Sequence, residues 1–306
     1  MKVAVTGSTG MIGSELIRLA LVKGDEVTAI VRPGSSRRAN LPEHENLTVL
    51  EADISDYPRL VGRFECDMFF HLAWKKTSGP DRDNAHLQAE NIQYALDAVD
   101  LAHSCGSHVF VGAGSQAEFG TVDRALDSTV PVDPSSGYGI AKYAAGKLCG
   151  MACSQYGMRF CWARILSVYG ERDGPNSLIS YLIDTLIQGG VPELTPCEQT
   201  WDYLYCKDAA DALYRLGLYG HDGRTYCLGS GEARSLRSYV EDVREAVGGS
   251  TEVRYGVKPY YPHQPMCLYA NISQLSQDTG FVPRHSFKEG IQSVVAFRRS
   301  MRDSER

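Results

Sequence analysis

Short apolar runs alternate with longer amphipathic segments along the first two-thirds of the chain. Six runs rich in valine, isoleucine and phenylalanine are predicted to form β-strands, at residues 2–6, 26–31, 47–51, 66–72, 107–112 and 158–165. Several of them are apolar throughout, which is typical of parallel strands buried on both faces. Apolar residues recur at helical spacing between the runs, most clearly at 11–24 and 84–106. This alternation predicts an α/β fold with a doubly wound parallel sheet of the Rossmann type.

The pattern changes after about residue 170. Helical segments predominate at 177–190, 207–220 and 236–249, with proline-rich links at 192–196 and 259–265. Residues 202–211 and 225–230 instead look like a strand–helix–strand return to the main sheet. We therefore expect a dinucleotide-binding domain of residues 1–169 that also includes 200–229. We expect residues 170–199 and 230–306 to form a smaller, mainly helical substrate-binding lobe.

Composition narrows the classes of partner. The net charge is −6, which disfavours a general nucleic-acid binder because such proteins present a basic face. The sequence contains no run of 18 apolar residues and no signal peptide, so we expect a cytoplasmic protein without a membrane partner. The nine cysteines are scattered, and we expect reduced, buried thiols and no metal site.

The segment KVAVTGSTGMIGSELIRLA at residues 2–20 carries the strongest local signal. Three glycines separate a predicted strand from a predicted helix. The first permits a tight turn, the second lets a pyrophosphate approach the backbone, and the third lets the helix pack against the strand. Amides at the start of the helix would point at the phosphates. The alternative is an ordinary tight turn. The candidate dinucleotide-binding residues are Gly7, Thr9, Gly10, Met11, Ile12 and Gly13.

The segment AIVRPGSSRR at residues 29–38 bears on the choice of dinucleotide. In such folds the second strand usually ends in an acid that binds the adenosine 2′-hydroxyl. Here it ends at Val31, and Arg32, Ser35, Arg37 and Arg38 follow. A guanidinium can bind two phosphate oxygens at once. We therefore expect NADP, with NAD as second choice, and assign Arg32, Ser35 and Arg37 to the 2′-phosphate. The alternative is a solvated basic loop.

Three further residues have the chemistry of a proton-transfer site. Tyr138 and Lys142 are four residues apart and share one face of a predicted helix. The lysine charge would favour the phenolate and bring the tyrosine pKa down from about 10. Ser115 follows the fifth predicted strand, at the edge where ligands bind in open α/β sheets. The alternatives are a chance helical spacing and a turn or cap serine.

These motifs together resemble the extended short-chain dehydrogenase/reductases of the NAD-dependent epimerase/dehydratase family. The matching segments occur in the family's order: TGSTGMIG at 6–13, Asp53-Ile54, His71-Leu72-Ala73, Ser115, Tyr138-x-x-x-Lys142, RILSVYG at 164–170 and WDYLYCKDAADA at 201–212. The resemblance implies a site of Ser115, Tyr138 and Lys142 that transfers hydride at a carbon of a nucleotide-activated sugar. It also implies that Asp53 and Ile54 contact the adenine, and that Leu72, Ala73 and Leu166 border the cofactor.

The chain departs from the family at positions that bear on the reaction. Dehydratases commonly carry Asp-Glu after the catalytic hydroxyl residue, where this chain has Gln116 and Ala117. Glu118 comes one place too late, on a segment expected to be extended, so we disfavour a 4,6-dehydratase. His71 is expected to be a satisfied core residue without a chemical role.

Other departures concern the substrate. Trp201 replaces an arginine that usually grips the substrate diphosphate, and YYPHQPM at 260–266 lacks a second one. Ser167 stands where an asparagine is frequent. Lys75, Lys76 and Arg172 are candidate replacements for the arginines, or else are surface charges.

The preferred function is NADPH-dependent reduction at a carbon, C4 above all, of a keto sugar linked to a nucleotide. The alternatives are a 4-epimerase that retains NAD, a reductase of a non-sugar carbonyl, and a cofactor-sensing regulator without turnover. Relatives in this family often dimerise through a four-helix contact. Such a homodimer would include the helix predicted at 138–156.

Overall fold

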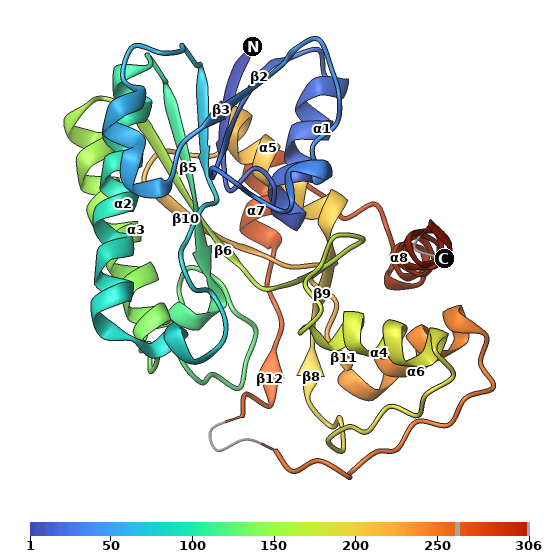
Figure 1. The fold of residues 1–306 in the computed structure, drawn as a ribbon. Helices are drawn as coiled ribbons and strands as arrows, with labels where there is room; N and C mark the ends of the chain where they lie inside the picture. Colours follow the sequence, from blue (N-terminus) through green and yellow to red (C-terminus); the bar gives the residue numbers. More distant parts are fainter. Residues whose placement is uncertain (261–263, 305–306) are drawn as a thin grey trace.

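The computed structural model describes residues 1–260 and 264–304, and its centre is a seven-stranded parallel sheet (Figure 1). The strand order is β10-β6-β5-β4-β1-β2-β3, which confirms the predicted doubly wound α/β fold. Every residue of β5 is buried, and all but its last residue, Ser115, are apolar or glycine. The strands are β1 (Lys2–Thr6), β2 (Glu26–Val31), β3 (Leu47–Glu51), β4 (Met68–His71), β5 (Val109–Ser115), β6 (Arg159–Ile165) and β10 (Arg224–Leu228).

Helices cover both faces of this sheet (Figure 1). On one face lie α1 (Met11–Val22), α5 (Cys206–Tyr219) and the short α7 (Ser273–Thr279). On the other face lie α2 (Ala85–Ser104) and α3 (Gly137–Gln155), which pack against each other. Four 3₁₀ turns complete this part of the chain: η1 (Arg38–Asn40), η2 (Ile54–Leu60), η3 (Pro80–Asp83) and η4 (Gln116–Glu118).

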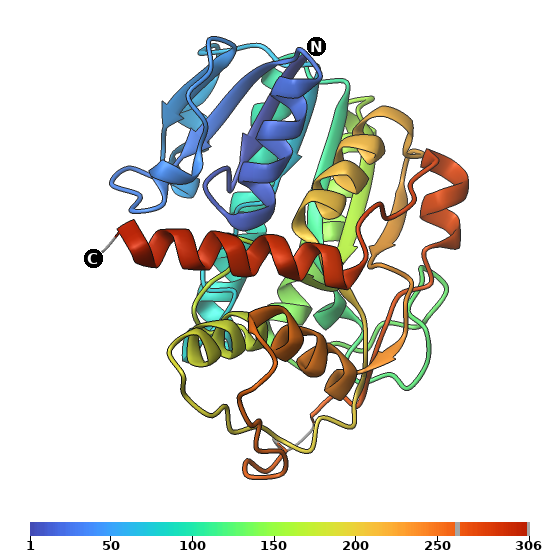
Figure 2. The ribbon, with the colours of Figure 1, turned by 90° about the vertical axis from the view of Figure 1, so that its right-hand side faces the viewer.

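The remaining helices surround a separate apolar core. They are α4 (Leu178–Ile187), α6 (Leu236–Val247) and α8 (Phe287–Ser304). Figure 2 shows α8 crossing the molecule between α1 and the pair α4 and α6. A small sheet lies beside them, in the order β11 (Arg234–Ser235), β8 (Thr200–Trp201) and β12 (Cys267–Leu268). Most of these elements lie in the segments expected to form the substrate lobe.

The expected return of the chain to the main sheet is correct for only one of its two strands. β10 pairs with β6 in the main sheet, as predicted. β9 (Tyr203–Tyr205) does not, because it pairs with β7 (Ser167–Tyr169) as a separate two-stranded sheet. The aromatic side chains of Tyr169, Tyr203 and Tyr205 contribute to the core of α4, α6 and α8, which draws β9 away from the main sheet.

The strand order creates a crevice at the carboxyl end of β1. The chain leaves β1 towards β2 and β3, and then returns to the other side of β1 to form β4. Ligands of open α/β sheets bind at such a switch point. The turns after β1 and β4, and the ends of β5 and β6, therefore meet at one edge of the sheet.

Three other observations bear on the sequence-based expectations. No helix within residues 1–260 and 264–304 is both long and apolar enough to span a membrane. In the same residues no three His, Cys, Asp or Glu side chains are grouped so that they could hold a metal ion. The nine cysteines are unpaired, and all but Cys267 are buried.

Candidate active site

The turn between β1 and α1 is one that glycine alone can make. Gly7 has a φ of +66°, and a Cβ added to it would lie 2.7 Å from the carbonyl carbon of Leu72. A Cβ on Gly13 would lie 2.3 Å from the carbonyl oxygen of Gly7. Gly10 is the N-cap residue of α1 and no side chain caps that helix. The first amides of α1 thus remain available to an anion, and the turn fits the pyrophosphate of a dinucleotide.

A cavity of about 320 Å³ opens at this turn. That volume falls within the range of small-molecule sites, roughly 300–1,000 Å³. Its lining joins ten of the residues predicted from the sequence: Gly7, Gly10, Met11, Ile12, Gly13, Leu72, Ser115, Tyr138, Lys142 and Leu166. It also contains five that the sequence analysis missed: Trp74, Thr77, Ala113, Gly114 and Ile165. The structure therefore brings the predicted glycine turn and the predicted catalytic residues to one cavity.

Tyr138 enters the cavity from the first turn of α3. Ser136 begins this helix, and its hydroxyl accepts a hydrogen bond from the Gly139 amide at 3.1 Å. Burial raises the pKa of the Tyr138 phenol, while a hydrogen bond with Ser115 and the charge of Arg82 act to lower it. The contact with Ser115 is the one expected of a pair that binds the same substrate oxygen. The charge that acts to lower the Tyr138 pKa is that of Arg82, and not that of Lys142 as predicted.

Lys142 lies deeper in the cavity. Its Nζ donates a hydrogen bond of 2.6 Å to the Ala113 carbonyl and lies 3.8 Å from the centre of the Trp74 ring. It is 5.8 Å from the centre of the Tyr138 ring. Burial lowers the pKa of Lys142 to about 7 from an ordinary value of 10.5. The lysine is therefore poised to gain or lose its proton near neutral pH.

Glu118 is an anchor in this structure and is not free to act as an acid or base. The segment that the sequence analysis expected to be extended forms the 3₁₀ turn η4. This turn buries the Glu118 carboxylate completely. The carboxylate accepts hydrogen bonds from the Ser115 amide at 2.8 Å, the Trp162 indole at 2.9 Å and Arg164 Nε at 2.7 Å. Ser115 Oγ in turn accepts from the Ala117 amide at 3.2 Å. This network fixes Ser115 at the end of β5.

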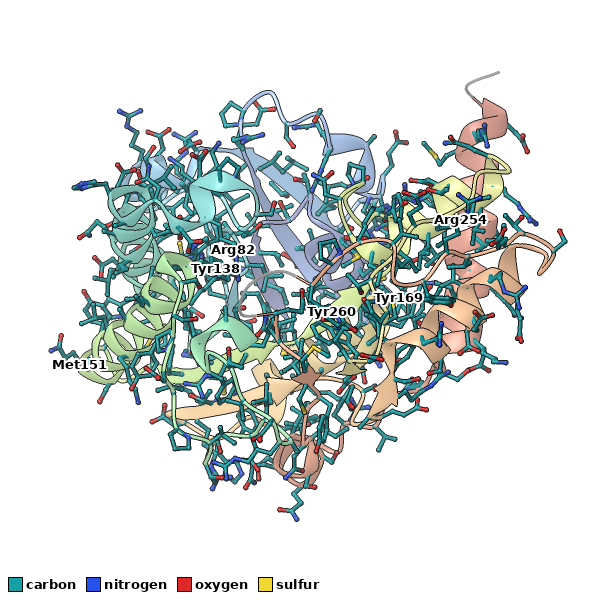
Figure 3. The ribbon with its side chains drawn as sticks, turned by 90° about the horizontal axis from the view of Figure 1, so that it is seen from below. Arg82, Tyr138, Met151, Tyr169, Arg254 and Tyr260 are labelled. Carbon is teal, nitrogen blue, oxygen red and sulfur yellow. The ribbon has the colours of Figure 1, made fainter. Side chains whose placement is uncertain are left out.

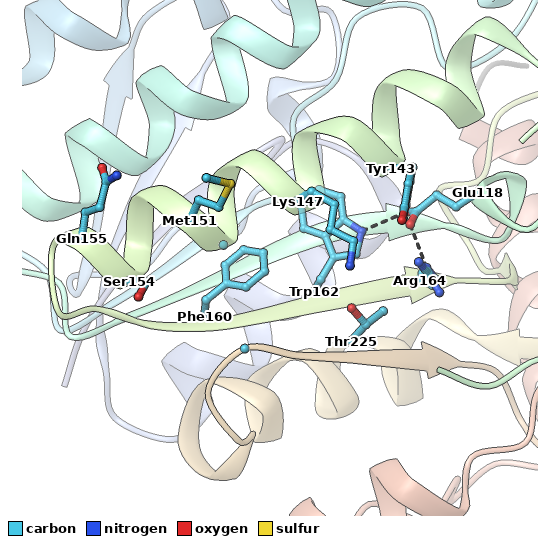
Figure 4. Close-up of a pocket in the computed structure, with 13 residues that line it drawn as sticks. Glu118, Tyr143, Lys147, Met151, Ser154, Gln155, Phe160, Trp162, Arg164 and Thr225 are labelled. Carbon is cyan, nitrogen blue, oxygen red and sulfur yellow. Dashed lines mark hydrogen bonds and ion pairs between the residues drawn. The ribbon is translucent and has the colours of Figure 1, made fainter. Parts of the chain in front are cut away.

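A second cavity lies behind this network, between α3, β6 and β10 (Figure 4). It measures about 490 Å³, and Lys147, Met151 and Phe160 contribute to its lining. Figure 4 shows Glu118, Trp162 and Arg164 at one end of it. Ser115, Tyr138 and Lys142 are not among its lining residues. The smaller cavity at the glycine turn is therefore the candidate active site.

The basic loop after β2 does not line the candidate site. Arg32, Arg37 and Arg38 are exposed, and Arg38 forms an ion pair of 2.9 Å with Glu51. Ser35 Oγ lies 3.4 Å from Thr9 Oγ1, so the loop borders the glycine turn. The ion pair engages Arg38, which is not one of the residues assigned to the 2′-phosphate, and the assignment of Arg32, Ser35 and Arg37 stays a prediction.

Four predicted cofactor contacts, Thr9, Asp53, Ile54 and Ala73, also lie outside the cavity lining. Asp53 begins η2, and Ile54 and Ala73 pack into the core beneath α2. Burial acts to raise the pKa of Asp53, but hydrogen bonds from Ser55 and the charge of Lys75 outweigh it and lower the pKa overall. The distance between Lys75 Nζ and Asp53 Oδ1 is 3.1 Å. Asp53 is therefore an ionised carboxylate at the carboxyl end of β3, and its contact with the adenine stays a prediction.

Two residues that differ from the family pattern, Trp201 and Ser167, contact each other. Trp201 Nε1 donates a hydrogen bond of 2.9 Å to Ser167 Oγ. In the segment 260–266, residues 261–263 lie outside the described residues. Tyr260 accepts a hydrogen bond of 3.1 Å from the Glu198 amide.

His71 is only half satisfied. The Thr6 hydroxyl oxygen accepts hydrogen bonds from the amides of Leu72 and Ala73 and lies 2.9 Å from His71 Nδ1. His71 Nε2 has no hydrogen-bond partner among the described residues. Burial lowers the pKa of His71 to about 3. His71 therefore stays neutral, and the expectation of a fully satisfied core residue was wrong in this respect.

Comparisons with known proteins agree with this geometry. The profile of the NAD dependent epimerase/dehydratase family matches residues 3–229. A UDP-glucose 4-epimerase of Mycolicibacterium smegmatis is 26% identical, over 98% of this chain and 99% of its own. The UDP-glucose 4-epimerase of Thermus thermophilus, solved in complex with NAD, is 25% identical with a TM-score of 0.86, over 97% of this chain and 99% of its own. The Thermotoga maritima UDP-glucose 4-epimerase shares the fold, with a TM-score of 0.89 and 22% identity over 98% of this chain and 99% of its own.

These similarities favour one of the alternatives drawn from the sequence over the preferred function. They support NAD rather than NADP as the first choice of cofactor. They give no support to NADPH-dependent reduction of a keto sugar, and an epimerase fits better.

Proposed function

Since the chain belongs to the NAD dependent epimerase/dehydratase family, we propose that it is a 4-epimerase that retains NAD and acts on a nucleotide-activated sugar. The observation that carries this proposal is the single cavity that holds the glycine turn together with Ser115, Tyr138 and Lys142. The similarity to UDP-glucose 4-epimerases supports it. Bound NAD supplies the chemistry of accepting a hydride from C4 and returning it.

The residues of the chain account for the remaining requirements. Tyr138 removes the proton of the C4 hydroxyl while the hydride leaves, and returns it when the hydride comes back. The Ser115 hydroxyl orients the same oxygen from the end of β5. Lys142, whose Nζ lies 5.8 Å from the centre of the Tyr138 ring, would hold the nicotinamide ribose, and Arg82 supplies a charge that acts to lower the Tyr138 pKa. Met11 and Ile12, with Gly7, Gly10 and Gly13, would hold the pyrophosphate.

The same cavity argues against dehydration. Loss of water across C5 and C6 needs a base at C5 and an acid at O6, both within hydrogen-bond reach. Gln116 and Ala117 cannot transfer protons near neutral pH. Glu118 is fully buried and engaged by three donors on the far side of Ser115. Epimerisation needs neither group.

The test is turnover of defined nucleotide sugars by the purified protein. UDP-glucose, UDP-N-acetylglucosamine and UDP-glucuronate are incubated with the protein, and the epimers are separated by chromatography. We expect a 4-epimer from at least one of them without net change in the absorbance of free NADH. Supplementing stripped protein with NAD should restore more activity than NADP does. Net consumption of NADPH with a keto sugar, and no epimer, would refute the proposal.

A further inference from the structure

The positive charges suggested as replacements for the missing phosphate-gripping arginines are already paired. Lys75 lies 3.1 Å from Asp53, and Lys76 lies 2.8 Å from Asp81. Arg172 lies 2.8 Å from Glu15. A substrate anion would have to compete with a carboxylate of the chain for each of them. These three side chains are therefore poor candidates for substrate contacts.

Arg82 differs from them. Its guanidinium carbon lies 4.8 Å from the centre of the Tyr138 ring, and Figure 3 shows the two side chains next to each other. Within residues 1–260 and 264–304 no carboxylate lies within ion-pair distance of this guanidinium. The side chain is nevertheless partly buried. A partly buried guanidinium without a counter-ion has lost hydration that no charge of the chain replaces.

The chain holds Arg82 in this position. Gly79, whose φ of +78° favours glycine, caps the turn η3, and Pro80 is the first residue of that turn. Asp83 Oδ1 accepts a hydrogen bond of 2.9 Å from the Gly137 amide, at the start of α3. A Cβ on Gly137 would lie 3.3 Å from the backbone of Asp83. The turn that carries Arg82 is therefore fastened to the turn of α3 that carries Tyr138.

We propose that Arg82 binds an oxyanion of the substrate beside the carbon that reacts. This inference rests on the proposed function, because it takes Tyr138 to mark the reacting carbon. The fork of a guanidinium matches the two oxygens of a carboxylate or of a phosphate. The oxyanion is a carboxylate on the sugar or a phosphate of the nucleotide. A carboxylate on the sugar is C6, attached to the neighbour of C4, whereas the phosphate is attached through C1 on the opposite side of the ring.

Binding to the NAD-loaded protein tests the inference separately from turnover. Calorimetric titrations with UDP-glucose and with UDP-glucuronate compare the wild type with Arg82→Gln, which keeps the length of the side chain and removes its charge. Arg82→Lys keeps the charge and loses the fork. Arg59→Gln is the matched control, because Arg59 is 82% exposed and its ion pair among the described residues is with Asp56 of its own turn.

We expect Arg82→Gln to weaken binding by about tenfold or more, since charge-assisted hydrogen bonds contribute roughly that much. A loss confined to UDP-glucuronate identifies the sugar carboxylate, and an equal loss for both ligands identifies the phosphate. Arg82→Lys should fall between, and Arg59→Gln should bind like the wild type.

Unchanged dissociation constants for both ligands in Arg82→Gln overturn the inference, even if kcat falls through an effect on the Tyr138 pKa. A wild type that binds neither ligand overturns it as well. A wild type that binds, but gives no epimer, refutes only the proposed function.

Discussion

Replacement of Glu118 by glutamine should cost the protein about 3–5 kcal/mol of unfolding free energy, the range for removal of one partner of a buried ion pair. The Glu118 side chain is 0% exposed and that of Arg164 is 7% exposed, so water cannot replace the lost contact. Glutamine could still accept from the Ser115 amide and the Trp162 indole. Its amide nitrogen would then face Arg164 Nε, and two donors would oppose each other.

Urea unfolding followed by fluorescence measures this cost in the NAD-free protein. The double variant Glu118→Gln/Arg164→Met should be more stable than the single variant, because it removes the uncompensated charge along with its partner. Glu51→Gln is the control, since it breaks an ion pair with Arg38 whose side chains are both more than half exposed. It should cost at most about 1 kcal/mol. A loss of similar size in Glu118→Gln and Glu51→Gln would refute the reasoning.

The other predictions concern chemistry and pH. Tyr138→Phe should lower kcat by roughly 10²–10⁴-fold, because it keeps the ring and removes the proton. NAD binding, measured by calorimetry, should stay near the wild-type value. Substantial turnover by this variant would exclude the proposed proton transfer. The pKa of Lys142 is about 7 in the folded protein and 10.5 ordinarily, so between pH 7 and 10 the unfolded chain binds more protons than the folded one. The unfolding free energy of the NAD-free wild type should therefore rise with pH relative to that of Lys142→Met, by up to about 1.4 kcal/mol per pH unit. Urea titrations at pH 7 and 9 measure this difference. If they show no such rise, the lowered pKa of the buried Lys142 is wrong. Mass spectrometry of UDP- or dTDP-glucose incubated with the protein should show no product lighter by one water, and such a product would give Glu118, or an unrecognised residue, the role of acid and base.

The sequence was sufficient to predict those elements whose structure depends on residues close together in the chain. The glycine turn could be predicted because Gly7 needs a positive φ and Gly13 touches the Gly7 carbonyl, and both requirements lie within eight residues. The parallel sheet followed from strands that are apolar on both faces. The pairing of β9 could not be predicted in this way, since an apolar strand of three residues fits either sheet. Its partner was decided by aromatic packing against the distant α8.

The candidate site shows the same limit. Ser115, Tyr138 and Lys142 were identified because they recur in a known order in the family. Arg82 was missed because its contact with Tyr138 spans 56 positions, and neither the charge nor the spacing of Arg82 marks it in the sequence. Glu118 was placed on an extended segment because a single 3₁₀ turn leaves no periodic pattern. Its role became visible only with the partners from β6.

The tryptophan on β6 illustrates how one unusual residue requires several others. A Cβ on Gly112 would lie 2.4 Å, and one on Gly114 2.3 Å, from atoms of the Trp162 ring. A Cβ on Gly146 of α3 would lie 2.7 Å from it. The indole therefore fits only because three neighbours are glycine. The indole donates a hydrogen bond to the buried carboxylate of Glu118, and this carboxylate also accepts one from the Ser115 amide.

A similar dependence between two residues bears on the arginine that Trp201 replaces. Trp201 and Ser167 look like two separate losses when each position is compared with the family, yet one hydrogen bond joins them. A tryptophan beside an asparagine would have to fit a larger side chain at that contact, so the two substitutions make one alternative arrangement. The absence of an arginine there removes one contact for a diphosphate and does not make the whole site unable to bind an anion. Among the described residues, the Arg82 guanidinium remains without a carboxylate partner beside Tyr138, although Arg82 itself does not line the cavity. If Arg82 binds the substrate anion as proposed, that anion is held from the side of η3 and not from Trp201.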